Sequence, residues 1–396
     1  MRGYKAFLSG NEAVALGVKL SRPHVIAAYP ITPQTVVMER LSEMVADGSL
    51  KCEFMHVESE HSALSAAMGA SAVGARTFTA TSSQGLLYMA ECLHYASGGR
   101  FPIVMMNANR SLALPWSIYG DQRDSLSLLD SGWIQVYVED AQESLDMIIQ
   151  AYAIAEHPKV LTPVMVNLDG FILTHTYEPV DVPDQESVDR FLPPFDTPYK
   201  LDLDNPKNMA FSSAPEDNME FKYQQHRAVL DAVEVIEETE RRFYEHFGRK
   251  YGGMVEAYRC EDAEMVLVTL GSVTGTARVV VDRLREEGWK VGLLKIRFMR
   301  PFPQKEIAEL SRTVKAIGVI DKDISFGYEG TVYTNVNSAV ARSGKNVVTI
   351  DFIAGLGGRS ISKKDIANMF SVLKSAAEGK RQKHVQFINL GVAIDE

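Results

Sequence analysis

The spacing of hydrophobic residues divides the chain into alternating short strands and amphipathic helices. Short stretches rich in apolar, β-branched or aromatic residues predict strands at 25–28, 52–57, 77–81, 102–106, 133–138 and 162–166. Helical spacing predicts helices between these runs, for example after Asn11 and over 141–157. Alternation of this kind is typical of a doubly wound α/β domain, which we place at residues 1–177.

A proline-rich segment interrupts the alternation. Seven prolines lie between positions 179 and 215, among many Asp and Asn residues. We predict a linker or an extended arm that wraps a neighbour, with no core element, and the length of the stretch favours the interacting arm. A long helix is predicted at 222–247, with Val229, Val233 and Phe243 on an apolar stripe and charges opposite. We assign residues 178–258 to this arm and connecting helix.

A second alternation of strands and helices begins near residue 260. Strands are predicted at 265–269, 291–296, 316–320 and 347–353, and helices at 276–287, 305–311, 332–341 and 363–375. These elements predict a second α/β domain at 259–376. The remaining residues, 377–396, are expected to form a peripheral C-terminal tail.

Composition narrows the class of protein. With 396 residues, 46% hydrophobic and 23% charged, the chain can bury a sizeable core. A net charge of −10 argues against general nucleic-acid binding. No apolar run approaches the roughly 20 residues of a membrane span, and the N-terminus lacks the apolar core of a signal peptide. Cys52, Cys92 and Cys260 lie far apart, which predicts a reducing cytoplasm and no iron–sulfur cluster in this chain.

The segment Tyr29–Thr35 directly follows the first predicted strand. Pro30 and Pro33 stiffen the turn at the carboxyl end of that strand, where α/β sheets bind ligands. Thr32 would present a hydroxyl at the start of the next helix, which suits a carboxylate or phosphate. The alternative is that Thr32 caps the helix and Pro33 is its first residue.

Further polar segments follow other strands. Glu58–His61 offers two carboxylates and an imidazole, either as a helix cap or as a buried proton-sharing group. Thr79–Gly85 has four hydroxyls but no P-loop spacing. Arg110 either binds a carboxylate or forms a surface ion pair, and the loop 114–124 could cover a pocket. Gly355–Arg359 either binds an anion through backbone amides or makes a tight connection.

Taken in order, these segments resemble the alpha subunit of the 2-oxoacid:ferredoxin oxidoreductases, of which pyruvate:ferredoxin oxidoreductase is the best-known member. The segments are Gly10–Ala13, Tyr29–Pro33, Glu58–His61, Thr79–Gly85, Asn109–Ser111, Gly271-Ser272, Arg300–Pro303 and Gly355–Arg359. They cover about residues 5–375, and their order is more specific than any single motif. The resemblance implies a pyrimidine-type thiamine diphosphate-binding domain followed by a transketolase C-terminal-like domain, both α/β.

The resemblance also implies an activity, the CoA-dependent oxidative decarboxylation of a 2-oxoacid. Electrons would pass through 4Fe–4S clusters to ferredoxin. By position, Glu60 matches the glutamate that hydrogen-bonds the aminopyrimidine ring of the cofactor and moves a proton there. Thr32 and Arg110 match the residues that bind the substrate carboxylate and carbonyl. The same resemblance assigns Ile31, Tyr119 and Asp121 to the substrate, and Tyr29, Pro30, Ser83 and Gln84 to the cofactor.

The resemblance further implies partner chains. The sequence has no Gly-Asp-Gly segment, which holds Mg²⁺ and the diphosphate in such enzymes; Asp47-Gly48 and Asp169-Gly170 lack that context. We therefore expect a beta subunit to bind Mg²⁺, the diphosphate and clusters, together with gamma- and delta-type subunits. Ferredoxin or another electron acceptor completes this cytoplasmic assembly. The isolated chain is expected to be colourless and inactive.

Two departures from the family pattern leave the 2-oxoacid open. Gln122-Arg123 stands where pyruvate enzymes often have His-Gln, and Trp116 is not the usual residue. Pyruvate is favoured because Thr32, Arg110 and the run Ser117–Asp121 follow its pattern. The alternative is an aromatic 2-oxoacid such as phenylglyoxylate, with NAD as a final acceptor. Two alternatives of other classes are a non-catalytic structural subunit and a transketolase-like enzyme without ferredoxin.

Overall fold

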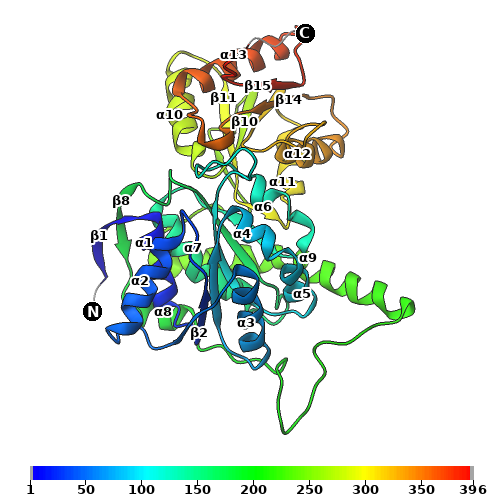
Figure 1. Ribbon diagram of the computed structural model, residues 1–396. Coiled ribbons are helices and arrows are strands. Elements are labelled where there is room, and N and C mark those ends of the chain that lie inside the picture. Colours follow the sequence, from blue (N-terminus) through cyan, green and yellow to red (C-terminus); the bar gives the residue numbers. More distant parts are fainter. Residues whose placement is uncertain (1–2, 393–396) are drawn as a thin grey trace.

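A computed structural model describes residues 3–392 and forms two α/β bodies joined along one side (Figure 1). The lower body in Figure 1 contains a seven-stranded sheet and the upper body a six-stranded sheet. Residues 1–2 of the first predicted domain and 393–396 of the predicted tail lie outside the described residues. The predicted α/β fold is confirmed. No helix within the described range combines the length and apolarity of a membrane span.

The seven-stranded sheet has the order β12-β6-β7-β5-β4-β2-β3. Its strands are β2 (Val25–Ala28), β3 (Glu53–His56), β4 (Thr77–Thr81), β5 (Val104–Asn109), β6 (Ile134–Tyr137), β7 (Val164–Asp169) and β12 (Phe298–Arg300). Each pairs in parallel with its neighbours except β12, which runs antiparallel to β6. The central strands β4, β5 and β7 are buried along their whole length because helices cover both faces of the sheet.

Helices cover this sheet on two sides (Figure 1). One face packs against α1 (Gly10–Leu20), α2 (Thr35–Ala46) and α7 (Ala141–Ala155). The other packs against α3 (Glu60–Ala72), α4 (Ser83–Tyr88) and α5 (Ala90–Gly98). Ala63 and Ala67 on α3 are fully buried, and their small side chains bring this helix close to the sheet. The short α6 (Arg123–Leu126) and a 3-10 turn, Leu129–Ser131, precede β6.

The predicted proline-rich arm is partly ordered core structure. β8 (Tyr177–Val182) pairs antiparallel with β1 (Tyr4–Ser9), and α8 (Gln185–Phe191) buries Val188 and Phe191. The prediction that this stretch contributes no core element is therefore wrong. The prediction failed because it took proline as evidence against strands. Pro179 lies in an edge strand and Pro183 directly after it, and at a sheet edge the missing N–H of proline is tolerated.

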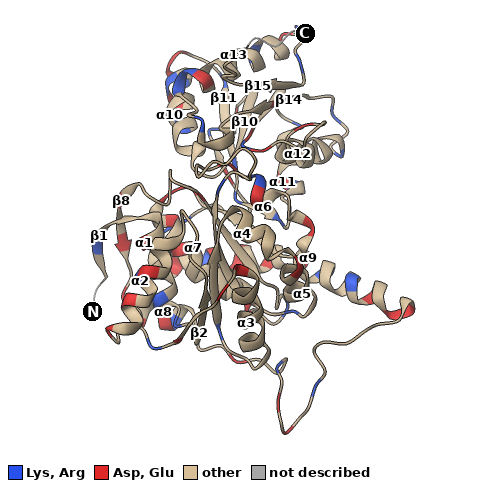
Figure 2. Ribbon diagram, viewed as in Figure 1, with Lys and Arg blue, Asp and Glu red and all other residues tan. Residues whose placement is uncertain are grey.

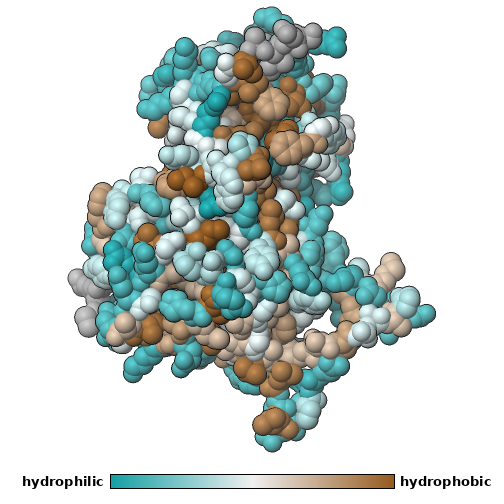
Figure 3. Space-filling model, in the orientation of Figure 1, coloured by the Kyte–Doolittle hydropathy of each residue, from teal (hydrophilic) through white to brown (hydrophobic). Residues whose placement is uncertain are grey.

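The long helix α9 (Pro215–Phe247) begins seven residues before its predicted start. Proline at the first turn and the acidic residues Glu216 and Asp217 beside it favour a helix N-terminus. The part of α9 up to residue 224 is exposed and projects from the lower body, with both charge signs along it (Figures 1 and 2). The preceding segment extends away from the lower body after Leu201, whose N–H donates to Ala72 O, and Leu203 in it is 98% exposed. Figure 3 shows hydrophobic groups on the surface of this extension.

The six-stranded sheet of the upper body has the order β15-β14-β13-β10-β11-β9. Its strands are β9 (Val255–Tyr258), β10 (Met265–Leu270), β11 (Val291–Ile296), β13 (Ala316–Asp321), β14 (Val348–Ile353) and β15 (Val385–Phe387). One face packs against α10 (Val273–Glu286) and α13 (Lys363–Ala377), the other against α11 (Gln304–Leu310) and α12 (Thr331–Ala341). β15 lies within the predicted tail, where backbone pairing with β14 forms a strand that has no apolar run.

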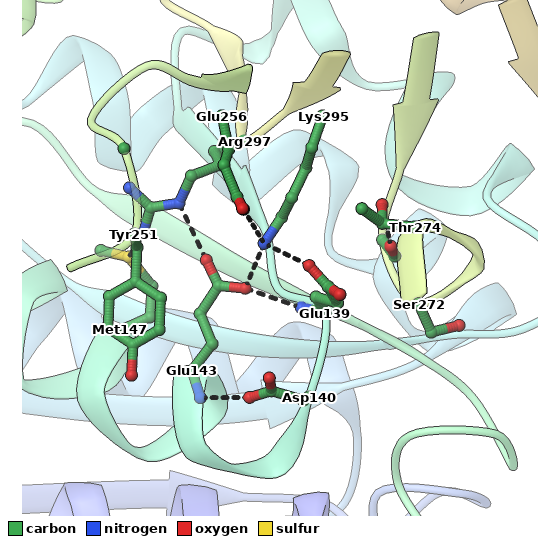
Figure 4. Close-up of polar contacts among 12 residues, drawn as sticks. Glu139, Asp140, Glu143, Met147, Tyr251, Glu256, Ser272, Thr274, Lys295 and Arg297 are labelled. Carbon is green, nitrogen blue, oxygen red and sulfur yellow. Dashed lines mark hydrogen bonds and ion pairs between the residues drawn. The ribbon is translucent and has the colours of Figure 1, made fainter. Parts of the chain in front are cut away.

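Two features join the bodies. The chain leaves β11 and places β12 in the sheet of the lower body, beside β6. Next to this crossing lies the interdomain cluster, formed by Glu139, Glu143, Lys295 and Arg297 (Figure 4). Lys295 Nζ lies 2.6 Å from Glu143 Oε2, and Arg297 Nε lies 2.8 Å from Glu143 Oε1. The bodies are therefore connected by a shared sheet and by buried ion pairs.

Candidate active site

Four strand ends of the lower body bring the predicted site residues together. β5, β4, β2 and β3 are neighbours and run parallel, so their carboxyl ends meet at one edge of the sheet. Tyr29–Thr32 follows β2, Glu60 follows β3, Ser83-Gln84 follows β4 and Arg110 follows β5. We call this edge the candidate active site; it faces the upper body (Figure 1).

Glu60 is the first residue of α3 and is 8% exposed. The cap residue Ser59 accepts a hydrogen bond from Ser62 N, and the helix N-terminus favours a carboxylate at this position. Gly85 on α4 lies directly against the carboxylate. A Cβ there would stand 2.6 Å from both Glu60 Oε1 and Thr81 Oγ1, so only glycine permits this approach. Thr81 Oγ1 is buried and has no hydrogen-bond partner.

Arg110 is 5% exposed and extends across the same edge. Its Nη1 donates to Thr32 O at 2.7 Å and its Nη2 donates to Gln84 Oε1 at 3.0 Å. Its Nε is buried and has no partner. Burial lowers the pKa of Arg110, and the nearby charges of Asp124 and Glu60 oppose that shift. The guanidinium is thus held in place by neutral oxygens and retains an unused donor.

The turn after β2 is fixed by the side chains beneath it. Gln34 Nε2 donates to Tyr29 O at 2.9 Å, and Asn11 Nδ2 donates to Pro33 O at 2.8 Å. Helix α2 begins at Thr35 with Gln34 at its cap, so the alternative that Thr32 caps this helix is wrong. Thr32 itself is exposed and contributes its carbonyl to Arg110.

The other residues of this turn, Pro30 and Ile31, lie at the same edge. Pro30 is exposed, whereas Tyr29 and Ile31 are half-buried. Tyr29, Pro30 and Ile31 therefore lie beside Thr32, directly after β2, as the sequence predicted. Their assignment to cofactor and substrate stays a prediction.

Ser83 and Gln84 are used in different ways. Ser83 is fully buried, and its hydroxyl lies 2.8 Å from Ser111 O and 2.7 Å from Gln84 Oε1. Gln84 is half-buried and its Oε1 accepts from Arg110. Ser83 therefore fixes the backbone of the site through Ser111, while Gln84 contacts the guanidinium of Arg110 directly.

The covering loop is seated on the upper body. Asp121 is fully buried, and its Oδ2 accepts a hydrogen bond from Gly357 N at 3.0 Å. Arg123 Nε also donates to this oxygen, at 3.1 Å. The glycine segment Gly355–Arg359 thus makes a tight connection and at the same time binds a carboxylate of the chain itself. Asp121 is engaged with the upper body and not with Arg110.

Tyr119 belongs to the same loop and is 55% exposed. Its ring lies 5.2 Å from the ring of Phe171. A Cβ on Gly358 would stand 2.4 Å from Tyr119 Cβ, so the upper body contacts the loop at this glycine. The main-chain oxygen of Tyr119 accepts a hydrogen bond from Ser111 N, next to Arg110, at 3.0 Å, and its assignment to the substrate stays a prediction.

Sequence reasoning missed the residues beneath the site. Asp124 is fully buried and accepts hydrogen bonds from Asn107 and Asn109 of β5. Lys322 Nζ reaches from the upper body to Asp169 Oδ1 at 2.7 Å. Two asparagines two residues apart on one strand were a signal, because they share a face of the sheet. No group of three His, Cys, Asp or Glu residues suited to a metal ion occurs in residues 3–392.

Two protein families match the chain. The description "Pyruvate flavodoxin/ferredoxin oxidoreductase, thiamine diP-bdg" covers residues 16–241. "Pyruvate:ferredoxin oxidoreductase core domain II" covers residues 263–366. These matches confirm the resemblance that the motifs indicated.

Curated relatives match over most of the chain. Pyruvate synthase subunit PorA of Methanothermobacter thermautotrophicus is 51% identical, over 91% of this chain and 92% of that protein. PorA of Pyrococcus abyssi is 47% identical, over 98% of each. Ketoisovalerate oxidoreductase subunit VorA of Pyrococcus horikoshii is 45% identical, also over 98% of each.

A solved structure shares the fold. It is the 2-oxoglutarate:ferredoxin oxidoreductase of Magnetococcus marinus with 2-oxoglutarate, coenzyme A and succinyl-CoA bound, at 21% identity and a TM-score of 0.72. The match covers 93% of this chain, which spans 65% of the length of that one. At this identity the likeness supports the architecture alone.

Proposed function

The chain belongs to the pyruvate flavodoxin/ferredoxin oxidoreductase family, and we propose that it is the alpha subunit of a CoA-dependent 2-oxoacid:ferredoxin oxidoreductase that favours pyruvate. Relatives named pyruvate synthase subunits support this substrate, at 51% and 47% identity over nearly their whole length. The observation that carries the proposal is the pair of buried groups, Glu60 and Arg110, at one sheet edge.

The residues present fit thiamine diphosphate and a 2-oxoacid. Glu60 offers a buried carboxylate to an aminopyrimidine, and this carboxylate lies directly against Gly85 and close to the unpartnered Thr81 Oγ1. Arg110 has an unpartnered Nε that suits the carboxylate of a 2-oxoacid. Thr81 Oγ1 and Arg110 Nε are buried without a hydrogen-bond partner, and burying such polar atoms costs free energy. A ligand that bonds to them would recover that cost, which is the physical reason to expect one here.

Each side chain then has a defined task. When bound, thiamine diphosphate supplies the electron sink that lets the bond between the substrate's carboxyl and carbonyl carbons break. Glu60 holds and moves a proton at the aminopyrimidine ring, and its burial at 8% exposure, on a helix whose Ala63, Leu64 and Ala67 are fully buried, limits the access of water to that carboxylate. Arg110 orients the substrate carboxylate. We assign the exposed Tyr119 of the covering loop to the substrate side chain.

The partner subunits are part of the proposal. The chain has no Gly-Asp-Gly segment and its three cysteines are isolated, so the diphosphate, Mg²⁺ and 4Fe–4S clusters are assigned to a beta subunit and its associates. Gamma- and delta-type subunits and ferredoxin complete the complex, which we place in the reducing cytoplasm because the cysteines are free.

Glu60→Gln tests the function directly. In the complex reconstituted with its partner subunits, CoA-dependent reduction of a viologen dye should fall by about a thousandfold, because the proton-moving group is lost. Glu58→Gln is the matched control: Glu58 is exposed, two residues earlier, and should leave turnover unchanged. Full turnover in Glu60→Gln would instead favour the non-catalytic alternative.

A substrate panel tests the specificity. The intact complex is assayed with pyruvate, 2-ketoisovalerate, 2-oxoglutarate and phenylglyoxylate, and kcat/KM should be highest for pyruvate. A higher value for phenylglyoxylate would replace pyruvate by the aromatic alternative. Activity without an iron–sulfur partner would favour the transketolase-like alternative.

A further inference from the structure

Asp124 is a fully buried carboxylate directly beneath the candidate active site. It is the second residue of α6, at the end of the covering loop. Its hydrogen-bond partners are N–H groups and not cations. Burying a carboxylate costs free energy unless its oxygens accept hydrogen bonds. The groups that donate to Asp124 therefore show which parts of the fold it fixes in place.

Five donors surround Asp124, and together they come from three parts of the fold. Its Oδ2 accepts from Ser83 N and Arg110 N, each at 3.1 Å, and from Asn107 Nδ2 at 3.3 Å. Its Oδ1 accepts from Asn109 Nδ2 at 2.7 Å and from Ser125 N at 2.8 Å. One carboxylate therefore connects the end of β5, the start of α4 and its own helix.

The bond to Ser83 reaches the Glu60 side of the site. Ser83 has a φ of 51°, a left-handed conformation that is strained for serine and is held by the surrounding contacts. It begins α4, which carries Gln84 against Arg110 and Gly85 against Glu60. The position of Ser83 thus sets how α4 lies between the two buried charges.

The bond to Arg110 reaches the other side. Asp124 binds the main-chain N–H at the residue whose guanidinium lies beside Thr32 and Gln84. It also places a negative charge near that guanidinium, which opposes the effect of burial on the pKa of Arg110. The same carboxylate therefore anchors the backbone of Arg110 and supports its charge.

We propose that Asp124 is a positioning residue that holds Arg110 at a set distance from Glu60 and so determines how tightly the 2-oxoacid binds. The inference rests on the proposed function, because it assigns Arg110 to the substrate carboxylate. It requires a carboxylate in particular. All five partners are donors, so an amide would place an NH₂ group against N–H groups on one side.

Asp124→Asn in the reconstituted complex tests the proposal. The KM for the 2-oxoacid should rise on the order of tenfold or more, because a buried donor set loses an acceptor and Arg110 shifts. The control is Asp130→Asn, the same change at an exposed aspartate six residues later, which should leave KM unchanged. The thermal midpoint of each variant is measured alongside.

The outcomes separate positioning from mere stability. A lower thermal midpoint with an unchanged KM would overturn the positioning role. If Asp124→Asn does not assemble, Asn109→Ala loosens the same carboxylate by removing the bond at 2.7 Å, and KM should still rise severalfold. An unchanged KM in Asn109→Ala would then overturn the proposal.

A further arm keeps the two proposals distinguishable. If Asp124 acts through Arg110, the effects of Asp124→Asn and Arg110→Gln on KM should be smaller together than the product of the two alone. A wild-type complex without CoA-dependent viologen reduction would end the proposed function before any variant is measured. Normal wild-type turnover with independent effects of the two variants would end only the positioning role.

Discussion

Two groups of buried charges lie where the bodies meet, and they differ in how their charges are compensated. In the interdomain cluster, Glu143 contacts Lys295 at 2.6 Å and Arg297 at 2.8 Å, so opposite charges face each other (Figure 4). In the candidate active site, Arg110 contacts neutral oxygens and Asp124 contacts N–H groups. The first group is complete within the chain, whereas the second leaves capacity for a ligand.

The pKa shifts follow from this difference. Burial acts to raise the pKa of Glu143, yet Lys295 and Arg297 hold it below its ordinary value. Burial raises the pKa of Asp124 to about 6, because its hydrogen bonds only partly compensate for lost hydration. Burial also raises the pKa of Asp140 beside the interdomain cluster and of Asp351 in the upper body, so the shift alone does not mark a functional site. The contacts of Asp124 with Ser83 and Arg110 are what connect it with the candidate active site.

The largest expected effect is on stability, at the interdomain cluster. Glu143→Ala removes the nearest carboxylate from two buried cations and leaves Lys295 with Glu139 and Arg297 with the more distant Glu240. The free energy of unfolding of the full chain should fall by up to about 3–5 kcal/mol. Urea unfolding of the full chain measures this. Glu237→Ala, at an exposed glutamate of α9, is the control and should change little. If the free energy of unfolding falls by less than about 1 kcal/mol in Glu143→Ala, the ion pairs of the interdomain cluster contribute no more than surface pairs, and the contrast with the candidate active site is lost.

The second effect is a pH dependence of opposite sign in the two groups. The pKa of Asp124 is raised from 3.8 to about 6, so the folded chain binds its proton more tightly than the unfolded chain. Relative to Asp124→Asn, the wild type should therefore gain stability as pH falls from about 7 toward 4, by up to about 3 kcal/mol.

Glu143 should behave in the reverse way, because its pKa is lowered from 4.5 in the folded chain. Its contribution is complete above the unfolded pKa and is lost as pH falls through the folded one. The stability difference between wild type and Glu143→Gln should stay level from about pH 7 to 5 and narrow below. Urea titrations across this range measure both differences, and slopes of the same sign would contradict the comparison.

The smallest effect concerns the space around Glu60. Gly85→Ala places a Cβ 2.6 Å from Glu60 Oε1 and Thr81 Oγ1, so the carboxylate must move and turnover should fall about tenfold. Gly69→Ala is the control, because that helical glycine has no atom within 4 Å of an added Cβ. Gly69→Ala should keep turnover and gain about 0.5–1 kcal/mol of stability. Equal turnover in both variants would contradict the inference that the close approach of Gly85 positions the Glu60 carboxylate.

Much of the fold could be predicted from local pattern. The predicted strands at 25–28, 77–81 and 291–296 coincide with β2, β4 and β11, because short stretches rich in apolar and β-branched residues form buried parallel strands. The elements that were missed are held by long-range pairing. β8 pairs with β1 across the chain, and β12 crosses from the upper body to β6. Neither β8 nor β12 contains an apolar run that would have identified it as a strand.

The candidate site divides in the same way. The positions after the strands located Glu60, Thr32 and Arg110, because ligand sites in such sheets lie at strand ends. Asp124 could not be found this way, since its partners Ser83 and Arg110 are 41 and 14 residues away in sequence. The carboxylate of Asp121 binds Gly357, which is 236 residues away, and no local pattern indicated that contact; the assignment of Asp121 to the substrate stays a prediction.

The sequence alone determined the α/β class, the strand ends that carry Glu60 and Arg110, and the absence of cysteine spacing for a cluster. These follow from periodicity and residue type, which are local properties of a chain. Only the tertiary structure decided which buried charges are compensated. Whether a carboxylate meets a lysine, as Glu143 does, or a set of N–H groups, as Asp124 does, depends on how distant segments pack, and no local pattern records it.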